Sequence, residues 1–532
     1  MALFAGMKVT IMGLGINGGG MESAKYLALN GAECTITDMK DEKILAPSIE
    51  ELQKLPGPHP PFRFVLGRHE MEDFTKADMV IKNPAVRPDS PYLAAAHCIE
   101  TDISLFLASS PARLIAVTGS KGKSITASAI HWVLSKTREN ILDKSKTPAQ
   151  NTVMPPSGGM AFLGGNITVS PLSFLDQLSD TDDVVLELSS WQLGDLQLCS
   201  TGKKPGLIKP RSAILTSIMP DHQDRYGGMD AYVNDKRIIY QGQDKEDATI
   251  ACIDDHWGLS FLAETSARCL PYSGQPFSED NCKQRPEFLN REGNFTGAWL
   301  DPNSGAGMIS CSDGIVEVVP PNILVPGIHN KKNCLAAALA LVDLGIPGSV
   351  IREHLESFPG IEHRLEFFRE IDGIRFYNDT AATIPEAAAA AIKAFTAGST
   401  KNKLHVILVA GGTDKNLDFS PLVKAVESAG TMLEIILLAG TGSEKLSALL
   451  KIACLPFYGP FENMEKAART ALELGDAYYR QVPPAAVETC PAKTAGPKPG
   501  VLAVLSPGCT SFGMFTNEFD RGRKWKEAVC RL

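Results

Sequence analysis

The sequence lacks the features that mark several common classes of protein. Its longest apolar runs, such as LEIILLAG, are far shorter than the roughly 18 residues that a membrane-spanning helix needs. Its 12 cysteines form no CxxC pairs, so no zinc site is expected. Lysine and arginine number 52 against 61 aspartates and glutamates, and the net charge of −9 argues against a nucleic-acid binder and against attachment to anionic membranes.

The amino-terminal stretch MALFAGMKVTIMG has neither the apolar core nor the small-residue cleavage site of a signal peptide. In such a chain the scattered cysteines are expected to be reduced thiols, most of them buried. We therefore expect a cytoplasmic protein. Its composition, 44% hydrophobic and 21% charged, is that of an ordinary globular chain.

Strand and helix patterns alternate along most of the chain, which predicts an α/β fold. Continuous apolar runs, for example at 184–188 and 248–252, indicate parallel strands buried on both faces. The alternation falls into three stretches. We predict a Rossmann-like first domain at 1–110, a central parallel-sheet domain with a phosphate loop at 111–360, and a Rossmann-like third domain at 361–532.

Three segments depart from this pattern. Residues 265–322 are rich in Gly, Pro, Asn and Ser, and they are predicted to form an antiparallel appendage. Residues 137–160 and 483–500 lack periodicity and are predicted to be inserted surface loops, whose role the sequence does not indicate.

The strongest chemical signal is VTGSKGKSIT, residues 117–126, where a buried strand runs into a glycine-rich turn and then a helix. Backbone N–H groups of such a loop surround phosphate oxygens, Lys123 can reach the β- and γ-phosphates, and the Ser124 hydroxyl can bind Mg²⁺. The alternative is a tight turn with solvated lysines, but the position after a buried strand favours the nucleotide site. Val117 stands where the full pattern has a glycine, so the loop is a shortened variant.

Two further segments place polar residues at the ends of buried strands. Glu187 ends the apolar run of VVLELSSWQL, where an acid beside a phosphate loop commonly meets the metal; the alternative is an exposed acid at a strand end. Asp221 and His222 follow another buried strand, and Lys236 lies on the next helix. Alone, Lys236 is a weak signal, because a helical lysine is usually solvated.

The amino-terminal glycines support a rival hypothesis. Gly13, Gly15 and Gly18 follow the first strand, and Asp38 ends the second, which fits a dinucleotide-binding fingerprint. An NAD-dependent oxidoreductase is therefore an alternative, although it leaves the phosphate loop unexplained. A non-catalytic nucleotide-binding scaffold is a third possibility.

Taken together, the motifs resemble those of the Mur ligase family. GSKGKS, ELSSWQL, DHQDRY followed by a lysine, GIHNKKN (327–333), GIEHRLE (360–366) and NDTAAT (378–383) occur in the family's order. The segments LSPGCTSF and GGTDKNLDFSPL look most like the D-glutamate-adding branch. The resemblance spans almost the whole chain, the two inserted loops apart.

The resemblance implies an ATP- and Mg²⁺-dependent ligase of peptidoglycan precursor synthesis. ATP would phosphorylate the carboxylate of UDP-N-acetylmuramoyl-L-alanine, and the amine of D-glutamate would displace the phosphate. The first domain would bind the UDP substrate, and the third would bind the acceptor and close over ATP, with a joint near 358–361. We expect a monomer.

The resemblance also implies a role for individual residues. Lys123 acts in catalysis together with the metal ligands Ser124, Glu187, His222 and Lys236, the last as a carbamate. ATP would be bound by Gly119, Ser120, Lys121, Gly122, Lys123, Ser124, Ile125, Asn330, Asn333, His363, Arg364 and Asp379. The UDP substrate would be bound by Gly15, Ile16, Asn17, Asp38 and Asn166. D-Glutamate would be bound by Thr383, Lys415 and Ser511.

Two positions depart from the family pattern. Ala381 stands where many members have a lysine, so one positive charge near the substrate is missing or comes from elsewhere. In addition, Phe519 is offset by one position from a phenylalanine expected after Ser511.

Overall fold

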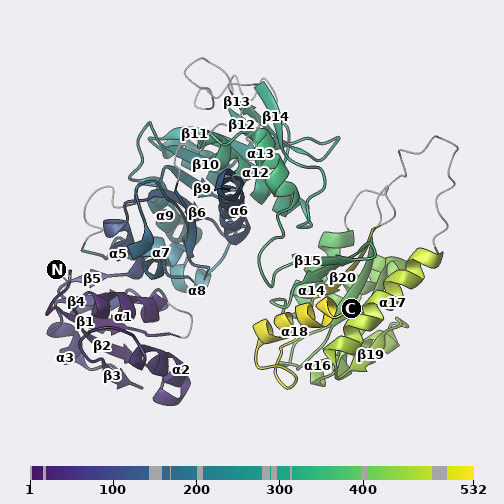
Figure 1. The fold of residues 1–532 in the computed structure, drawn as a ribbon, viewed down its shortest axis with the longest axis horizontal. Helices are drawn as coiled ribbons and strands as arrows, with labels where there is room; N and C mark the ends of the chain where they lie inside the picture. The colour runs from purple at the N-terminus through teal and green to yellow at the C-terminus, as the bar shows by residue number, and fades with distance from the viewer. Residues whose placement is uncertain are drawn as a thin grey trace. The chain divides into compact units, whose positions relative to one another are not determined.

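The computed structural model describes residues 3–15, 19–142, 159–167, 169–200, 208–277, 288, 296–311, 314–396, 404–481 and 500–532. The chain divides into two compact units (Figure 1). The first contains Met1–Asn322 and Lys332–Glu356, and the second contains Ile323–Lys331 and Ser357–Leu532.

The first sheet of the first unit, purple in Figure 1, is parallel throughout and has the strand order β3-β2-β1-β4-β5. Its strands are β1 (Lys8–Met12), β2 (Glu33–Asp38), β3 (Arg63–Leu66), β4 (Met79–Lys82) and β5 (Ile99–Glu100). Its helices are α1 (Gly19–Leu29), α2 (Glu42–Gln53), α3 (Met71–Thr75), α4 (Pro91–Ala94) and α5 (Asp102–Ser109). The βαβ pattern that the sequence predicts from residue 8 to residue 38 is confirmed.

The second sheet of this unit has nine strands in the order β14-β13-β12-β11-β10-β9-β6-β8-β7. Its strands are β6 (Arg113–Thr118), β7 (Ala161–Gly165), β8 (Asp183–Glu187), β9 (Ser212–Leu215), β10 (Ala248–Cys252), β11 (Arg268–Ser273), β12 (Gly297–Leu300), β13 (Gly307–Cys311) and β14 (Gly314–Val319). Strands β8, β9 and β10 are buried at every residue and β6 at its last four, as expected of the centre of a parallel sheet, whereas the edge strand β7 is only partly buried.

The predicted antiparallel appendage at 265–322 is only partly correct. Strands β12, β13 and β14 do pair antiparallel, but β11 pairs in parallel with β10, and β12 pairs in parallel with β11. The segment therefore extends the central sheet. The Gly and Pro content of a segment marks its turns but does not determine the direction in which its strands pair.

The helices of this unit begin at the carboxyl ends of the strands or connect them. They are α6 (Lys123–Leu142), α7 (Ser190–Asp195), α8 (Gln223–Tyr226), α9 (Met229–Arg237), α10 (His256–Glu264) and α13 (Gly348–Glu356). Helix α12 (Ile328–Asp343) includes residues of both units. The predicted loop at 137–160 is wrong at its start, because α6 continues to Leu142; residues 143–158 lie outside the described part of the chain.

The second unit contains a six-stranded sheet in the order β15-β16-β20-β17-β18-β19, parallel except for the β15–β16 pair. Its strands are β15 (Glu366–Ile371), β16 (Ile374–Asn378), β17 (His405–Ala410), β18 (Leu433–Leu438), β19 (Tyr458–Phe461) and β20 (Val501–Leu505). Its helices are α14 (Pro385–Thr396), α15 (Ser420–Ala429), α16 (Thr441–Ile452), α17 (Met464–Gln481) and α18 (Glu518–Cys530). Residues 483–499 of the predicted loop at 483–500 lie outside the described part of the chain.

This sheet separates two cores. Side chains of α14 and α15, such as Ile392 and Leu422, pack on one face with Leu408 of β17. Side chains of α17 and α18, such as Ala467 and Trp525, pack on the other face. Successive side chains of β17 and β20 point alternately into the two cores. This period of two is expected of a sheet that helices cover on both faces.

Within the described residues, no helix combines the length and the apolar character needed to cross a membrane. The ten cysteines that the structure describes are all free, and five of them are buried.

Candidate active site

The glycine-rich loop between β6 and α6 is held in place by neighbouring loops of the same unit. Gly119 and Gly122 have φ values of 143° and 98°. A Cβ atom at Gly119 would lie 1.9 Å from Thr216 Oγ1, and one at Gly122 would lie 2.3 Å from Asn333 Oδ1. Both positions therefore require glycine for conformation and for space. Asn333, a predicted ATP-binding residue, lies against the loop.

Ser120 fixes the loop to the segment after β9. Its Oγ accepts from Met219 N at 2.9 Å and lies 2.8 Å from the Tyr232 hydroxyl oxygen. Its backbone N–H donates to Ser217 O at 2.9 Å. The loop leads directly into α6, a 20-residue helix, so Lys123 and Ser124 stand at the positive end of the helix dipole. A phosphate group is the ligand that such a helix end favours.

Two lysine side chains converge on the same carbonyl oxygen of this loop. Lys236 Nζ donates to Gly119 O at 2.9 Å, and Lys123 Nζ donates to the same oxygen at 3.1 Å. Lys236 is only 1% exposed, and its ammonium lies 4.4 Å from the centre of the Tyr232 ring. Burial, with the nearby charge of Lys123, lowers the pKa of Lys236 to about 7. The alternative that Lys236 is a solvated helical lysine is wrong.

Glu187 ends β8 next to the phosphate-loop strand, with Val117 of β6 as its neighbour in register. It is 1% exposed, so the alternative of a solvated strand-end acid is also wrong. Glu187 Oε1 accepts from Asn166 Nδ2 at 2.8 Å, whereas Oε2 is buried and has no hydrogen-bond partner within the described residues. A buried carboxylate oxygen of this kind fits a Mg²⁺ ligand, because Mg²⁺ prefers oxygen.

His222 lies in the loop after β9 with a left-handed φ of 50°. Its ring centre is 4.9 Å from that of Trp191, which follows Glu187 by four residues. The preceding Asp221 forms an ion pair with Lys121 of the phosphate loop at 3.4 Å. The loop that carries His222 is thereby tied both to the segment after Glu187 and to the phosphate loop.

The residues present fit a Mg²⁺ site on one condition. Ser124 and Glu187 offer oxygen atoms and His222 a ring nitrogen, but an unmodified Lys236 amine is not a usual Mg²⁺ ligand. A carbamate on Lys236 would add carboxylate-like oxygens, and the lowered pKa of Lys236 supplies the neutral amine that carbamate formation requires.

In the described part of the amino-terminal glycine loop, Gly15 contacts Asp38. Asp38 lies at the end of β2, where its carboxylate accepts from Gly15 N at 3.2 Å and from Lys40 N at 2.9 Å. Ile16 and Asn17, two of the predicted UDP-substrate residues, lie outside the described part of the chain. Asn166, another of them, is exposed, and its side-chain amide donates to Glu187 Oε1 at 2.8 Å.

Four predicted nucleotide residues belong to the second unit. Asn330 Nδ2 donates to Pro326 O at 2.6 Å. Asn330 belongs to the second unit, whereas Asn333 belongs to the first. His363 Nδ1 accepts from Asn378 Nδ2 at 2.9 Å. Asp379 Oδ2 accepts from Ser506 Oγ at 2.6 Å, and burial raises the pKa of Asp379 to about 7. Arg364 is exposed.

The three predicted acceptor residues lie in loops that follow neighbouring parallel strands of the second unit. Thr383 follows β16, Lys415 follows β17 and Ser511 follows β20. Gly508 N donates to Ala382 O at 2.8 Å, which ties the first of these loops to the third.

The second and third of these loops also meet. Thr413 and Thr510 form a two-bond bridge with both N–O distances at 3.1 Å, and Lys415 Nζ lies 5.9 Å from the Phe512 ring centre. Ser511 is buried and Lys415 is exposed. The three loops are therefore side by side at the carboxyl edge of this sheet, where α/β domains bind ligands.

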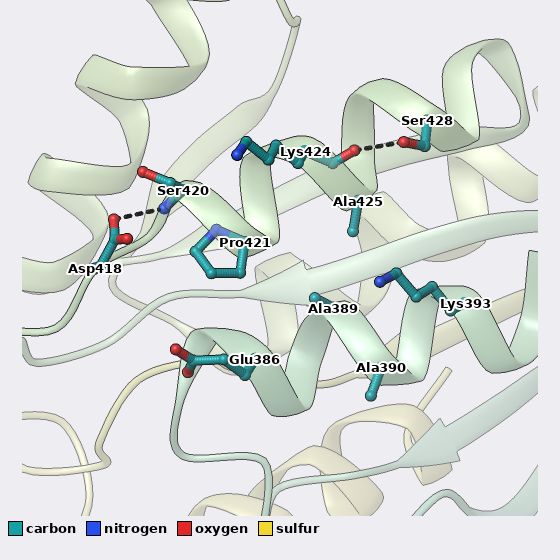
Figure 2. Close-up of a pocket in the computed structure, with 10 residues that line it drawn as sticks. All are labelled: Glu386, Ala389, Ala390, Lys393, Asp418, Ser420, Pro421, Lys424, Ala425 and Ser428. Atoms are coloured by element: carbon teal, nitrogen blue, oxygen red, sulfur yellow. Dashed lines mark hydrogen bonds between the residues drawn. The ribbon is translucent and has the colours of Figure 1, made fainter.

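A separate groove of about 480 Å³ lies between α14 and α15 (Figure 2). Ala389 and Ala425 are buried at its base, and Lys393 and Lys424 lie on the two helices that flank it. Glu386 and Asp418 balance the charge of the two lysines. None of the predicted site residues lines this groove.

Several residues of the site were not singled out from the sequence. Tyr232 supports both Ser120 and Lys236, and its position four residues before Lys236, on the same face of α9, is a signal that could have found it. Arg521 is fully buried in the second unit and donates to Thr380 O at 2.9 Å and Cys509 O at 3.0 Å. No short motif indicates that contact, because it joins segments distant in sequence.

The sequence is similar to that of known proteins along nearly its whole length. The Mur ligase middle domain matches residues 117–341. The chain is 38% identical over 589 residues to the UDP-N-acetylmuramoylalanine--D-glutamate ligase of Treponema pallidum (strain Nichols), with 99% of this chain and 98% of the relative covered. It is 34% identical over 543 residues to the enzyme of the same name from Roseiflexus sp. (strain RS-1), with 99% and 98% covered.

Among solved structures, the UDP-N-acetylmuramoylalanyl-D-glutamyl-2,6-diaminopimelate--D-alanyl-D-alanyl ligase from Acinetobacter baumannii matches with a TM-score of 0.50 and 14% identity, over 99% of this chain and 93% of that one. This likeness concerns the fold alone. The identity of 34–38% to these relatives over nearly the full length, with the match to the middle domain, establishes that the chain belongs to the Mur ligase family, in the group of the UDP-N-acetylmuramoylalanine--D-glutamate ligases.

Proposed function

We propose that this protein is an ATP-dependent ligase that joins D-glutamate to UDP-N-acetylmuramoyl-L-alanine and releases ADP and phosphate. The reaction belongs to the synthesis of the peptidoglycan precursor. Family membership supports this function over an NAD-dependent oxidoreductase or a non-catalytic scaffold. The observation that carries the mechanism is the convergence of buried Lys236 and of Lys123 on the phosphate loop, next to buried Glu187.

In the first step, a carboxylate oxygen of the muramoyl substrate attacks the γ-phosphorus of ATP, and the bond to the β-phosphate oxygen breaks. The products are an acyl phosphate and ADP. Two anions must approach each other, so cationic groups have to offset their repulsion. The Lys123 ammonium and the amino end of α6 would do this at the γ-phosphate. When bound, Mg²⁺ would neutralise part of the phosphate charge, held by Ser124, Glu187, His222 and a carbamylated Lys236.

The carbamate on Lys236 would form from the neutral amine and CO₂, with loss of one proton. It would replace a cation by an anion within hydrogen-bond reach of the phosphate loop. The Tyr232 ring lies against the Lys236 amine, and the Tyr232 hydroxyl contacts Ser120 Oγ. These contacts would hold α9 and the phosphate loop in fixed positions relative to each other.

In the second step, the neutral amine of D-glutamate attacks the acyl carbon. The tetrahedral intermediate then loses a proton from its nitrogen and collapses to the amide as the bond from the acyl carbon to the phosphate oxygen breaks. Thr383, Lys415 and Ser511 are proposed to bind the two carboxylates of D-glutamate, because the loops that carry them meet at one edge of the sheet. An acyl phosphate is hydrolysed by water, so a site closed to solvent would protect it.

The remaining assignments are also proposals. Gly15, Ile16, Asn17 and Asp38 would bind the UDP part of the substrate, and Asn330, His363, Arg364 and Asp379 would contribute to ATP binding. We further propose three domains with boundaries near residues 110 and 360, a monomeric state and a location in the cytoplasm.

A substrate-omission assay tests the proposed function. ADP release should require ATP, Mg²⁺, UDP-N-acetylmuramoyl-L-alanine and D-glutamate together. In thermal unfolding, the muramoyl substrate should raise the melting temperature and NAD should not. ADP release that is independent of the muramoyl substrate, or stabilisation by NAD alone, would contradict the proposal.

A further inference from the structure

Among the residues that the structure describes, a hydrogen-bond partner is found for one oxygen of the Glu187 carboxylate and not for the other. Asn166 Nδ2 donates to Oε1 at 2.8 Å, and Oε2 is buried with no hydrogen-bond partner in the described part of the chain. A buried carboxylate oxygen without a hydrogen-bond partner lowers the stability of the folded protein. The arrangement is explained if Oε2 meets a cation while Oε1 is fixed by the amide.

The pairing of β7 with β8 places Asn166 next to this carboxylate. Strands β7 and β8 pair in parallel with Gly165 opposite Glu187, and Asn166 N donates to Glu187 O at 2.8 Å. Gly165 has a φ of 99°, and a Cβ atom there would lie 2.1 Å from Glu187 O. Only glycine allows this approach. Asn166 is therefore attached to Glu187 through its main chain as well as its side chain.

We propose that Asn166 is a positioning residue for the metal ion: its amide fixes Glu187 Oε1 and thereby directs Oε2 toward Mg²⁺. The inference rests on the metal site of the proposed function. An amide N–H repels a cation, so Asn166 Nδ2 acts through Glu187 and not as a ligand. Because Asn166 itself is exposed, its side chain also remains accessible to the muramoyl substrate.

The consequence is a measurable change in metal affinity. Hydrogen-bond partners of metal ligands typically contribute roughly 10- to 100-fold to affinity. Removing the amide frees the Glu187 carboxylate to rotate, and the metal ion must then hold it in place. Asn166→Ala should therefore weaken metal binding by that factor. Asn166→Gln keeps an amide donor on a longer arm and should recover part of the loss.

Mn²⁺ binding to the full-length enzyme in the presence of ADP, followed by electron paramagnetic resonance, measures this without turnover. Asn166→Ala is expected to bind Mn²⁺ roughly 10- to 100-fold more weakly than the wild type. Asn303→Ala, an exposed asparagine in a turn of the same unit, serves as the matched control and should bind as the wild type does. In the ligase assay, the Mg²⁺ concentration for half-maximal rate should rise by a similar factor in Asn166→Ala, while KM for D-glutamate stays constant.

Equal Mn²⁺ affinity in Asn166→Ala and the wild type would overturn the inference. So would a rise in KM for the muramoyl substrate with unchanged Mn²⁺ affinity, because Asn166 would then be a substrate contact alone. A wild type that binds Mn²⁺ with ADP but uses no D-glutamate would overturn the proposed function and leave this inference intact. A wild type that binds no Mn²⁺ with ADP would overturn the inference.

Discussion

Replacing Lys236 by methionine should separate stability from activity. Lys236 is 1% exposed, and burial lowers its pKa from 10.5 to about 7. Because the folded state holds this proton less tightly than the unfolded chain, stability should rise as the pH increases from about 7 towards 10.5. Below about pH 7, Lys236 is protonated in both the folded and the unfolded state. Burying the charged ammonium then lowers the free energy of unfolding by about 5 kcal/mol, which corresponds to this difference in pKa.

Lys236→Met removes the buried charge and with it this loss of stability. It also removes the hydrogen bond to Gly119 O, which contributes about 1 kcal/mol to the free energy of unfolding. Between pH 9 and pH 6, the free energy of unfolding of Lys236→Met should therefore gain about 3 kcal/mol relative to the wild type. Ligase activity should nevertheless be almost abolished, because the variant cannot form a carbamate. Small carboxylic acids should restore part of the activity of Lys236→Ala, in which the shorter side chain leaves room for them.

Urea unfolding followed by tryptophan fluorescence measures this difference, since Trp132, Trp191, Trp257 and Trp299 lie in the first unit and only Trp525 in the second. The buffers must be free of CO₂. Added bicarbonate should then stabilise the wild type but not Lys236→Met. Lys136→Met, at a half-buried position of α6, is the matched control. The same stability difference at both pH values would refute the reasoning, and so would a wild type that bicarbonate does not affect.

Four other variants or conditions test the remaining parts of the account. Lys123→Ala should lower kcat roughly 10²- to 10³-fold without unfolding the protein, whereas Lys136→Ala on the same helix should not; near-normal ADP release by Lys123→Ala would exclude the loop as the catalytic site. Lys415→Ala should raise KM for D-glutamate by roughly 10- to 150-fold and leave KM for ATP unchanged, because a hydrogen bond to a charged group contributes about 1.5–3 kcal/mol. Lys424→Ala, an exposed lysine of α15, should change neither constant. The pKa of Asp379, raised to about 7, means that the folded state keeps its proton as the unfolded chain loses it, so stability falls as the pH rises from about 4 to 7. From pH 5 to pH 8, the free energy of unfolding of Asp379→Asn should therefore increase by about 2–3 kcal/mol relative to that of the wild type. Trp525 fluorescence follows this unfolding, and the same difference between variant and wild type at both pH values would contradict the prediction. Removal of Mg²⁺ by a chelator should abolish ADP release, and added Mg²⁺ should restore it; activity that survives the chelator would contradict a metal-dependent step.

The sequence predicts local elements well where one segment determines them. The strand at 248–252 and the βαβ unit that ends at Asp38 follow from apolar runs and glycine turns alone. The sequence also places Lys123 and Glu187 near the ends of buried strands and Lys236 on a helix that follows another buried strand. That Glu187 and Lys236 are buried, however, depends on the whole sheet.

What the sequence could not determine are contacts between distant segments. The parallel pairing of β11 with β10 depends on a crossover through α10, and composition does not report its direction. The amide of Asn166 on Glu187 joins residues on two strands, and it became visible only with the β7–β8 register. The burial of Arg521 against Thr380 and Cys509 is of the same kind.

The most direct test of the central claim is an acceptor screen with the purified protein. ATP, Mg²⁺ and UDP-N-acetylmuramoyl-L-alanine are mixed with each candidate amino acid in turn, and both ADP and the mass of the UDP-linked product are measured. The account predicts ADP release with D-glutamate and a product heavier by one glutamyl residue. ADP release with a basic amino acid such as lysine, and none with D-glutamate, would contradict it.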